Sequence, residues 1–238
     1  MKKTIAVIAL AGLSTGAFAG GFDGFNVDLG IGGAGTSTKM SGSDQFDVAG
    51  GPTFNGTTNS GSFNGMATLG YSQEIADSGF NLAANLFYVI GNQKSGALNN
   101  GGNFTDTNGD SLTLNQNVQN VSMKNTWGIS VEPGWNFGKT TLGYAKLAWV
   151  NSNLNSTATV YGYNNTTSQT ADVNGTQSFN KNVNGFGYGI GAKQLITDNL
   201  YLKAEVMGVS YGSASFGDGA YSIKPTQVMG FASIGYKF

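Results

Sequence analysis

Apolar side chains occupy alternate positions in eight stretches of the sequence, which is the period of a β-strand with one apolar face. The clearest stretch is 126–137, where Trp127, Ile129 and Val131 alternate with small or polar residues. The eight stretches are 25–31, 63–71, 80–90, 126–137, 144–149, 185–193, 200–207 and 228–238. Most approach the about ten residues that a tilted strand needs to cross a bilayer, so the pattern favours membrane-spanning strands.

The connections between these stretches alternate in length. The short ones are 73–79, 138–140 and 197–199, and the long ones are roughly 33–62, 91–125, 151–181 and 212–227. Short turns at one end and long polar loops at the other are typical of outer-membrane β-barrels. The sequence therefore predicts an all-β fold: an eight-stranded antiparallel transmembrane up-and-down β-barrel with short periplasmic turns and four long extracellular loops.

A ten-stranded barrel is the alternative architecture. The stretches 111–123 and 157–163 alternate weakly, and they could pair with each other above the membrane. We interpret them instead as extensions of the strands over 126–137 and 144–149 beyond the bilayer.

Aromatic residues lie near both ends of the predicted apolar faces. Trp127 and Trp135 are eight residues apart on one face, which corresponds to about 20 Å along the membrane normal in a tilted strand. The aromatic girdles of such barrels flank an apolar band of about 25 Å. The residues predicted to form these girdles are Tyr71, Tyr88, Trp127, Trp135, Phe137, Trp149, Tyr236 and Phe238. The core of a soluble β-sandwich is the alternative, but it would not explain the sorted loop lengths.

The first 19 residues have the layout of a secretory signal peptide. Lys2 and Lys3 precede an apolar run at 4–13, and Ala17-Phe18-Ala19 forms a small-x-small cleavage motif. The apolar run is about half the length of a membrane-spanning helix. We therefore expect 1–19 to be a signal peptide and 20–238 to be an outer-membrane β-barrel, located in the bacterial outer membrane.

The composition excludes several kinds of site. The chain contains no Cys, no His and no Arg, which excludes disulfides, histidine-based catalysis and histidine metal ligands. Residues 20–238 carry 10 Lys against 13 acidic residues, which is not the basic surplus of a nucleic-acid-binding protein. We predict a protein that is not an enzyme and that has no catalytic residues, no cofactor and no metal site.

Two short motifs resemble ligand-binding loops. Segment 30–35 matches G-x-G-x-x-G, but the dinucleotide motif needs a helix after it, and the residues that follow lack a helical period. Segment 106–110 resembles the start of a calcium loop, but Ser111 and Asn117 stand where Gly and Glu are required. We interpret the first as strand glycines and the second as a solvated loop, with a loose divalent-cation or lipopolysaccharide-bridging role as the alternative.

Six ionisable residues fall on the polar faces of the predicted strands and should point into the barrel. These lumen charges are Asp28, Glu132, Lys146, Lys193, Lys203 and Glu205. A hairpin centred near Lys139 would place Glu132 opposite Lys146, where opposite charges attract. The interior of an eight-stranded barrel is only wide enough for side chains, so we predict a packed lumen with ion pairs. A small or gated pore whose charges set selectivity is the alternative.

Two segments resemble a known family. Residues 185–205 resemble the penultimate hairpin of opacity-protein-like and OmpA-type outer-membrane β-barrel domains, and residues 228–238 resemble their terminal strand. The resemblance implies that the barrel assembly machinery reads this last strand, with Ile234, Tyr236 and Phe238 as the assembly signal. We expect no periplasmic peptidoglycan-binding domain.

Together these features predict an integral outer-membrane protein with a structural or surface-interaction role. That role would be envelope integrity, adhesion or contact with lipopolysaccharide through the long loops. The expected partners are outer-membrane lipids, lipopolysaccharide, the assembly machinery and host or neighbouring-cell surfaces, but not nucleic acid. A narrow porin-like channel for small solutes or ions is the alternative function.

Overall fold

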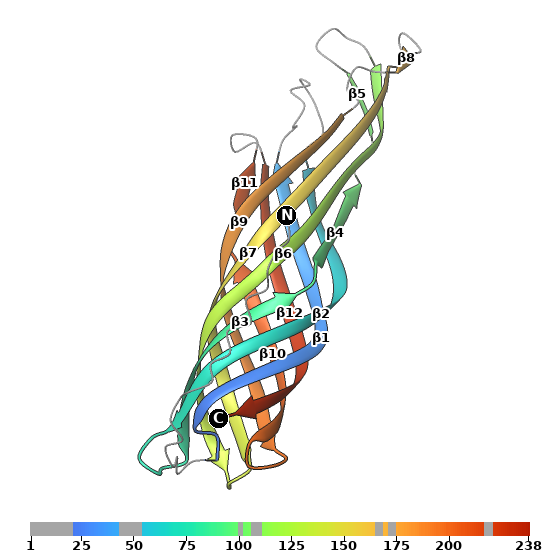
Figure 1. Cartoon of the computed structure of the whole chain (residues 1–238). Helices are drawn as coiled ribbons and strands as arrows, with labels where there is room; N and C mark the ends of the chain where they lie inside the picture. Colours follow the sequence, from blue (N-terminus) through green and yellow to red (C-terminus); the bar gives the residue numbers. More distant parts are fainter. Residues whose placement is uncertain are drawn as a thin grey trace, which may run out of the picture.

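The computed structural model describes residues 21–42, 54–99, 102–105, 111–164, 169–170, 175–216 and 221–238. The expected signal peptide and segment 106–110 lie outside these residues. The strands within them are β1 (Gly24–Gly42), β2 (Phe54–Glu74), β3 (Phe80–Ile90), β4 (Gln93–Asn99), β5 (Gly102–Thr105), β6 (Ser111–Phe137), β7 (Thr141–Asn164), β8 (Gln169–Thr170), β9 (Gly175–Leu195), β10 (Leu200–Tyr211), β11 (Ala214–Phe216) and β12 (Tyr221–Lys237). All belong to one sheet of antiparallel ladders (Figure 1).

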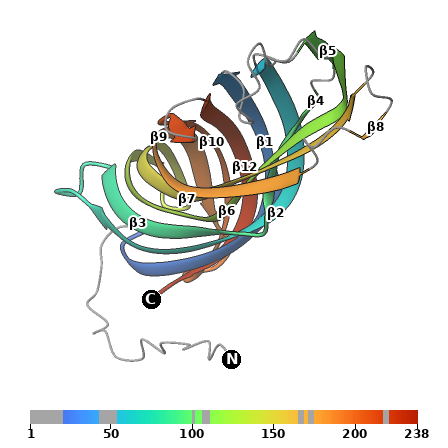
Figure 2. The ribbon, with the colours of Figure 1, turned by 90° about the horizontal axis from the view of Figure 1, so that it is seen from above.

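Eight of these strands close into a barrel. They pair in the order β1, β2, β3, β6, β7, β9, β10 and β12, and β12 returns to pair with β1. The closing ladder runs from Asn26↔Lys237 to Gly42↔Tyr221. Seen from above, the strands surround the barrel axis (Figure 2). The predicted eight-stranded antiparallel up-and-down barrel is therefore confirmed.

Three tight connections lie together at one end of the barrel, which we call the turn end. They join β2 to β3, β6 to β7 and β9 to β10, as the alternation of loop lengths predicts. The chain also finishes there, where the amide of Phe238 donates to the carbonyl of Phe25 at 2.8 Å. The opposite end, which we call the loop end, carries the long connections.

Several strands continue well beyond the predicted stretches. The ladder between β6 and β7 reaches Leu112↔Asn164, so 111–123 and 157–163 extend existing strands, and the ten-stranded alternative is wrong. Much of the sequence predicted as loop at 33–62 and 151–181 is likewise strand. Polar residues predominate there, and only scattered inward residues such as Met40 and Leu154 are apolar, so the apolar period weakens while backbone pairing continues. Of the eight barrel strands, β6, β7 and β9 rise farthest toward the loop end in Figure 1.

One ladder of the wall stops early. Pairing between β2 and β3 ends at Gly65↔Ile90, and Gly91 then adopts a positive φ of 114°, which a side chain would disfavour. The chain continues as β4, which pairs with β6 but, in the described ranges, not with β2. The side chain of Thr58 donates to the carbonyl of Ser95 at 2.5 Å across this break. The buried residues of β4 therefore lie inside the barrel near its loop end.

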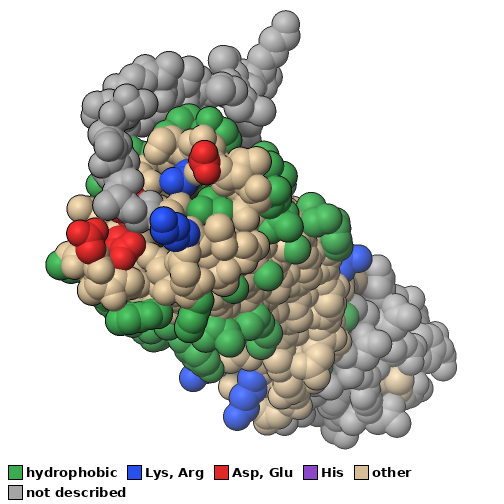
Figure 3. Space-filling view, turned by 90° about the horizontal axis from the view of Figure 1, so that it is seen from below, with side chains coloured by type: hydrophobic (Ala, Val, Ile, Leu, Met, Phe, Trp, Pro, Cys, Tyr) green, Lys and Arg blue, Asp and Glu red, His purple; other side chains and the backbone are tan. Residues whose placement is uncertain are grey.

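The two faces of the wall differ in chemistry. Outward residues such as Leu29, Ile129 and Ile190 are large, apolar and more than half exposed, and Figure 3 shows such side chains along the wall beyond the turn end. Inward residues form an extended apolar cluster, with charged residues nearer the turn end. A closed barrel leaves no unpaired edge, and with an apolar exterior it meets the requirements for spanning a bilayer.

Candidate functional site inside the barrel

The six predicted lumen charges all point into the barrel and are buried. Asp28 comes from β1, Glu132 from β6, Lys146 from β7, Lys193 from β9, and Lys203 and Glu205 from β10. Their exposed fractions lie between 1% and 7%. Strand alternation explains this placement, because each residue is an even number of positions from the other inward-facing polar residues of its strand.

These six residues form one chain of alternating charge. Lys203 Nζ lies 3.2 Å from Asp28 and 3.3 Å from Glu205, and Lys146 Nζ lies 3.0 Å from Glu205. Lys146 Nζ also lies 3.3 Å from Glu132, the cross-strand pair that the hairpin register predicts, and Lys193 Nζ lies 3.5 Å from Glu132. Three positive and three negative groups thus balance each other. Buried charges are tolerated when they are paired and hydrogen-bonded in this way.

Two tyrosines complete the cluster and were not identified from the sequence as part of it. Tyr144 Oη donates to Glu205 at 2.9 Å, and Tyr201 Oη donates to Asp28 at 3.3 Å. The Lys193 ammonium lies 5.3 Å from the ring centroid of Tyr144 and 5.8 Å from that of Tyr201. The sequence did contain a sign of their position. Each tyrosine precedes an inward lysine by two residues, so it lies on the same, inward face of its strand.

Glycines on the intervening strands make room for these tyrosines. Gly191 is the cross-strand neighbour of both Tyr144 and Glu205, so the hydrogen bond between them passes over it. A Cβ on Gly191 would lie 2.3 Å from the Tyr144 ring. Gly235 stands in the same way between Asp28 and Tyr201, and its Cβ would lie 2.2 Å from the Tyr201 ring. These inward glycines therefore leave the space that the two tyrosine rings of the cluster occupy.

Further layers fill the lumen toward the loop end. Apolar side chains such as Met66, Phe87 and Met207 are buried beyond the charges. A polar bridge follows, in which Gln227 Nε2 donates to Thr36 Oγ1 at 3.0 Å and to Gln93 Oε1 at 2.7 Å. These contacts connect β12 with β1 and β4 across the interior. Packed side chains thus occupy the described lumen from the charge cluster to this bridge.

The eight predicted girdle residues lie on the outer wall. Trp127 and Trp149 meet edge to face with ring centroids 5.2 Å apart, toward the loop end of the apolar band. Tyr236 and Phe238 pack at the same centroid distance near the turn end. Tyr71 contacts Phe25 at 5.0 Å. The remaining three, Tyr88, Trp135 and Phe137, are also exposed.

The residues predicted as the assembly signal line one exposed column. Ile234 and Tyr236 of β12 and Phe238, the residue after it, point outward, with between 44% and 57% of each side chain exposed. β12 pairs with β10 on one side and with β1 on the other. This geometry leaves the three side chains free for contacts outside the barrel.

In the described part of the chain, no group of three or more metal-ligating side chains lies together. Segment 30–35 lies within β1, a strand with no helix after it in the described chain. No helix among the described residues is long and apolar enough to cross a membrane.

Comparison with known proteins gives likeness of fold. No protein-family model matches the sequence, and no curated protein matches it significantly. Neisserial surface protein A is 12% identical with a TM-score of 0.46, covering 91% of this chain and 98% of that one. The outer membrane protease OmpT of Escherichia coli is 12% identical with a TM-score of 0.40, covering 96% and 99%. Ail of Yersinia pestis, solved with the heparin analogue sucrose octasulfate, is 11% identical with a TM-score of 0.39, covering 90% and 99%.

These identities concern the fold alone, and the compared structures include a protease. The closed ladder and the apolar exterior of the chain itself make it an eight-stranded antiparallel barrel of the outer-membrane type. The absence of enzyme activity stays a prediction.

Proposed function

We propose that the protein is an integral bacterial outer-membrane barrel that is closed to solutes and has a structural and surface role. The observation that carries this proposal is the buried chain of six charges, which fills the lumen together with Tyr144 and Tyr201. A water-filled pore would need its charged side chains to be solvated. Here the charges are neutralised by each other, and apolar layers pack against them.

The surface role is supported by the strands that continue past the apolar band. β6, β7 and β9 carry the wall beyond the girdle at Trp127 and Trp149. Outward Asn153 donates to Asn182 at 3.0 Å on this extension, so its exterior is amide-rich and suited to water or sugars. The barrel would therefore hold its longest connections away from the membrane, toward host or neighbouring-cell surfaces. Without histidine, a Ser/His hydrolase site is excluded, and we propose a non-enzymatic role.

Single-channel recording in planar bilayers tests the closed lumen. The wild-type protein should insert without conductance steps, and a known porin serves as the positive control. Discrete ion-selective steps from the wild type would overturn the closed barrel and favour the narrow channel.

Membrane fractionation tests the proposed location and assembly. The protein should fractionate with the outer membrane, and its migration in a gel should change on boiling, as expected for a stable barrel. We also propose that Phe238 is read by the assembly machinery. Phe238→Ala should therefore lower the folded fraction in cells, whereas Phe63→Ala, which truncates an equally outward aromatic residue, should not. Equal losses in both variants would contradict the assembly role.

A further inference from the structure

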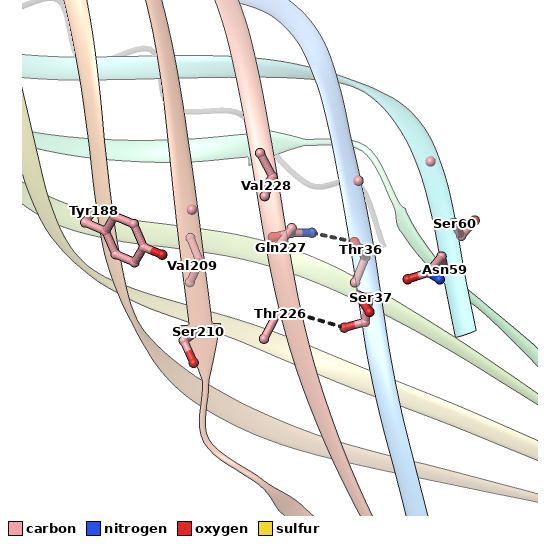
Figure 4. Close-up of a pocket in the computed structure, with 13 residues that line it drawn as sticks. Thr36, Ser37, Asn59, Ser60, Tyr188, Val209, Ser210, Thr226, Gln227 and Val228 are labelled. Carbon is pink, nitrogen blue, oxygen red and sulfur yellow. Dashed lines mark hydrogen bonds between the residues drawn. The ribbon is translucent and has the colours of Figure 1, made fainter. Parts of the chain in front are cut away.

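A groove of about 720 Å³ crosses the outer wall at the loop-end border of the apolar band. It lies over β10, β12, β1 and β2, with Tyr188 of β9 at one side and Asn59 at the other (Figure 4). The wall is hollow there because outward positions on three strands are glycines, namely Gly35, Gly61 and Gly208. A Cβ on Gly61 would meet no heavy atom within 4 Å, so this space is open.

The groove changes from apolar to polar along the barrel. Val228 lines its edge nearest the apolar band, and it is 59% exposed. The Tyr188 ring lies beside Gly208, with Cζ 3.5 Å from where a Cβ would stand, and it presents an exposed aromatic face. Ser37 and Thr226 follow toward the loop end, where Thr226 Oγ1 donates to the Ser37 carbonyl at 3.2 Å.

Two lysines lie immediately beyond these polar residues. Lys39 and Lys224 are direct cross-strand neighbours on β1 and β12, and both are exposed. Like charges in this arrangement repel each other and weaken a ladder. Within the described chain neither lysine has an ion-pair partner, and the loop-end walls described beyond the band contain no Asp or Glu. An anion bound between the two ammonium groups would remove the repulsion.

We propose that the groove binds the phosphorylated sugar headgroup of an anionic glycolipid, which in the outer leaflet is lipopolysaccharide. Lys39 and Lys224 would contact phosphate, because ammonium groups bind phosphate oxygens by charge-assisted hydrogen bonds. Ser37, Thr226 and Asn59 would face sugar hydroxyls, and the Tyr188 ring would lie against a sugar face. The volume suits one such headgroup.

The order of groups along the wall matches the order within such a lipid. Acyl chains would run along the exposed side chains of Val228 and Ile31, and the sugar and phosphate would follow toward the loop end. The site therefore rests on the proposed outer-membrane location. It goes further by assigning lipopolysaccharide contact to the barrel wall and not to the long loops.

Binding to the folded protein in detergent micelles tests the site. The probes are purified lipopolysaccharide, the same glycolipid after removal of its phosphates, and phosphatidylglycerol, with affinity measured by native mass spectrometry. Lys39→Gln with Lys224→Gln should lower the affinity for lipopolysaccharide about tenfold, the effect of losing two charge-assisted contacts at an exposed site. Gly61→Leu should lower it by filling the groove. The wild type should bind the dephosphorylated glycolipid and phosphatidylglycerol more weakly.

The matched control is Lys94→Gln with Lys124→Gln, which removes two exposed lysines of β4 and β6 that do not line the groove. It should change affinity by less than about twofold if binding is local. The proposal would be overturned if both double variants lost affinity for lipopolysaccharide equally, or if Lys39→Gln with Lys224→Gln left that affinity unchanged. It would also be overturned if the wild type bound phosphatidylglycerol as tightly as lipopolysaccharide. Heat-dependent migration in a gel confirms that each variant is folded.

The site and the proposed location can fail separately. A protein that binds lipopolysaccharide in micelles but is absent from the outer membrane would refute the proposed location and leave the binding site in the groove supported.

Discussion

Glu205 has three polar partners in the buried charge cluster. It accepts from Tyr144 and Lys146, and it lies 3.3 Å from Lys203. Its importance follows from position and not from residue type, since Asp77 and Asp198 carry the same charge on exposed turns. Sequence phase predicted that Glu205 would point inward. It did not predict Lys146 as its partner, because these residues lie on strands that are not neighbours.

Glu205→Gln should therefore destabilise the barrel strongly. The variant would leave three buried lysines facing two carboxylates, and uncompensated buried charge typically costs about 3 kcal/mol or more. The free energy of unfolding in urea, measured in micelles at neutral pH, reports this loss. Asp198→Asn is the matched control and should stay within about 0.5 kcal/mol of wild type. Similar effects for the two variants would show that the ion-pair chain contributes little to stability.

At the scale of strands, β9 and β12 act as glycine-containing spacers between strands that carry larger groups. Gly191 separates Tyr144 of β7 from Glu205 of β10, and Gly235 separates Asp28 of β1 from Tyr201 of β10. The alternation of glycine and apolar residues in 185–193 predicted a strand. The sequence did not predict that these glycines make room for side chains of the two flanking strands, because that follows only from the register of the three strands.

Gly191→Ala tests this complementarity. The added methyl would overlap the Tyr144 ring and displace it from Glu205, and overpacking of this kind costs about 1–3 kcal/mol. In a Tyr144→Ala background the penalty should fall, because a contact pair shows coupling in a double-mutant cycle. Urea unfolding of all four proteins measures the coupling. Gly61→Ala, with open space around the added carbon, should be nearly neutral, and additive penalties would contradict the spacer role.

At the scale of the whole molecule, the apolar band fixes how the barrel sits in a bilayer. Trp135 pairs with Phe80 of β3 near the turn end, whereas Trp127 pairs with Tyr88 eight residues farther along β6. Both tryptophans are exposed on the outer wall. The distance between them corresponds to most of the apolar thickness of such a barrel.

Single-tryptophan variants in vesicles with brominated lipids should report these depths. Trp135 and Trp127 should each be quenched more strongly by bromine placed near the headgroup than by bromine at the chain end. An acrylamide titration in water provides the control for solvent exposure. Strongest quenching from the chain end, or none from either lipid, would contradict the proposed position of the band.

The sequence alone determined the strand number, the strand order, the turn end and the direction of the main inward and outward residues. These properties follow from a local period of two and from connection lengths, which need no knowledge of distant contacts. The weak alternation at 111–123 and 157–163 predicted the extensions of β6 and β7. The sequence missed the extensions of β1, β2 and β9, because mostly polar residues there carry little apolar period even when backbone pairing persists.

Only the tertiary structure decided which side chains meet across the barrel. Closure between β1 and β12 sets the stagger of every strand, and that stagger brings Asp28 to Lys203 and Lys146 to Glu205 over intervening strands. The same closure places Lys39 beside Lys224, 185 positions apart in the chain, above a groove formed by glycines of separate strands. Such meetings depend on the curvature and shear of the closed wall, and neither is encoded in any single stretch of sequence.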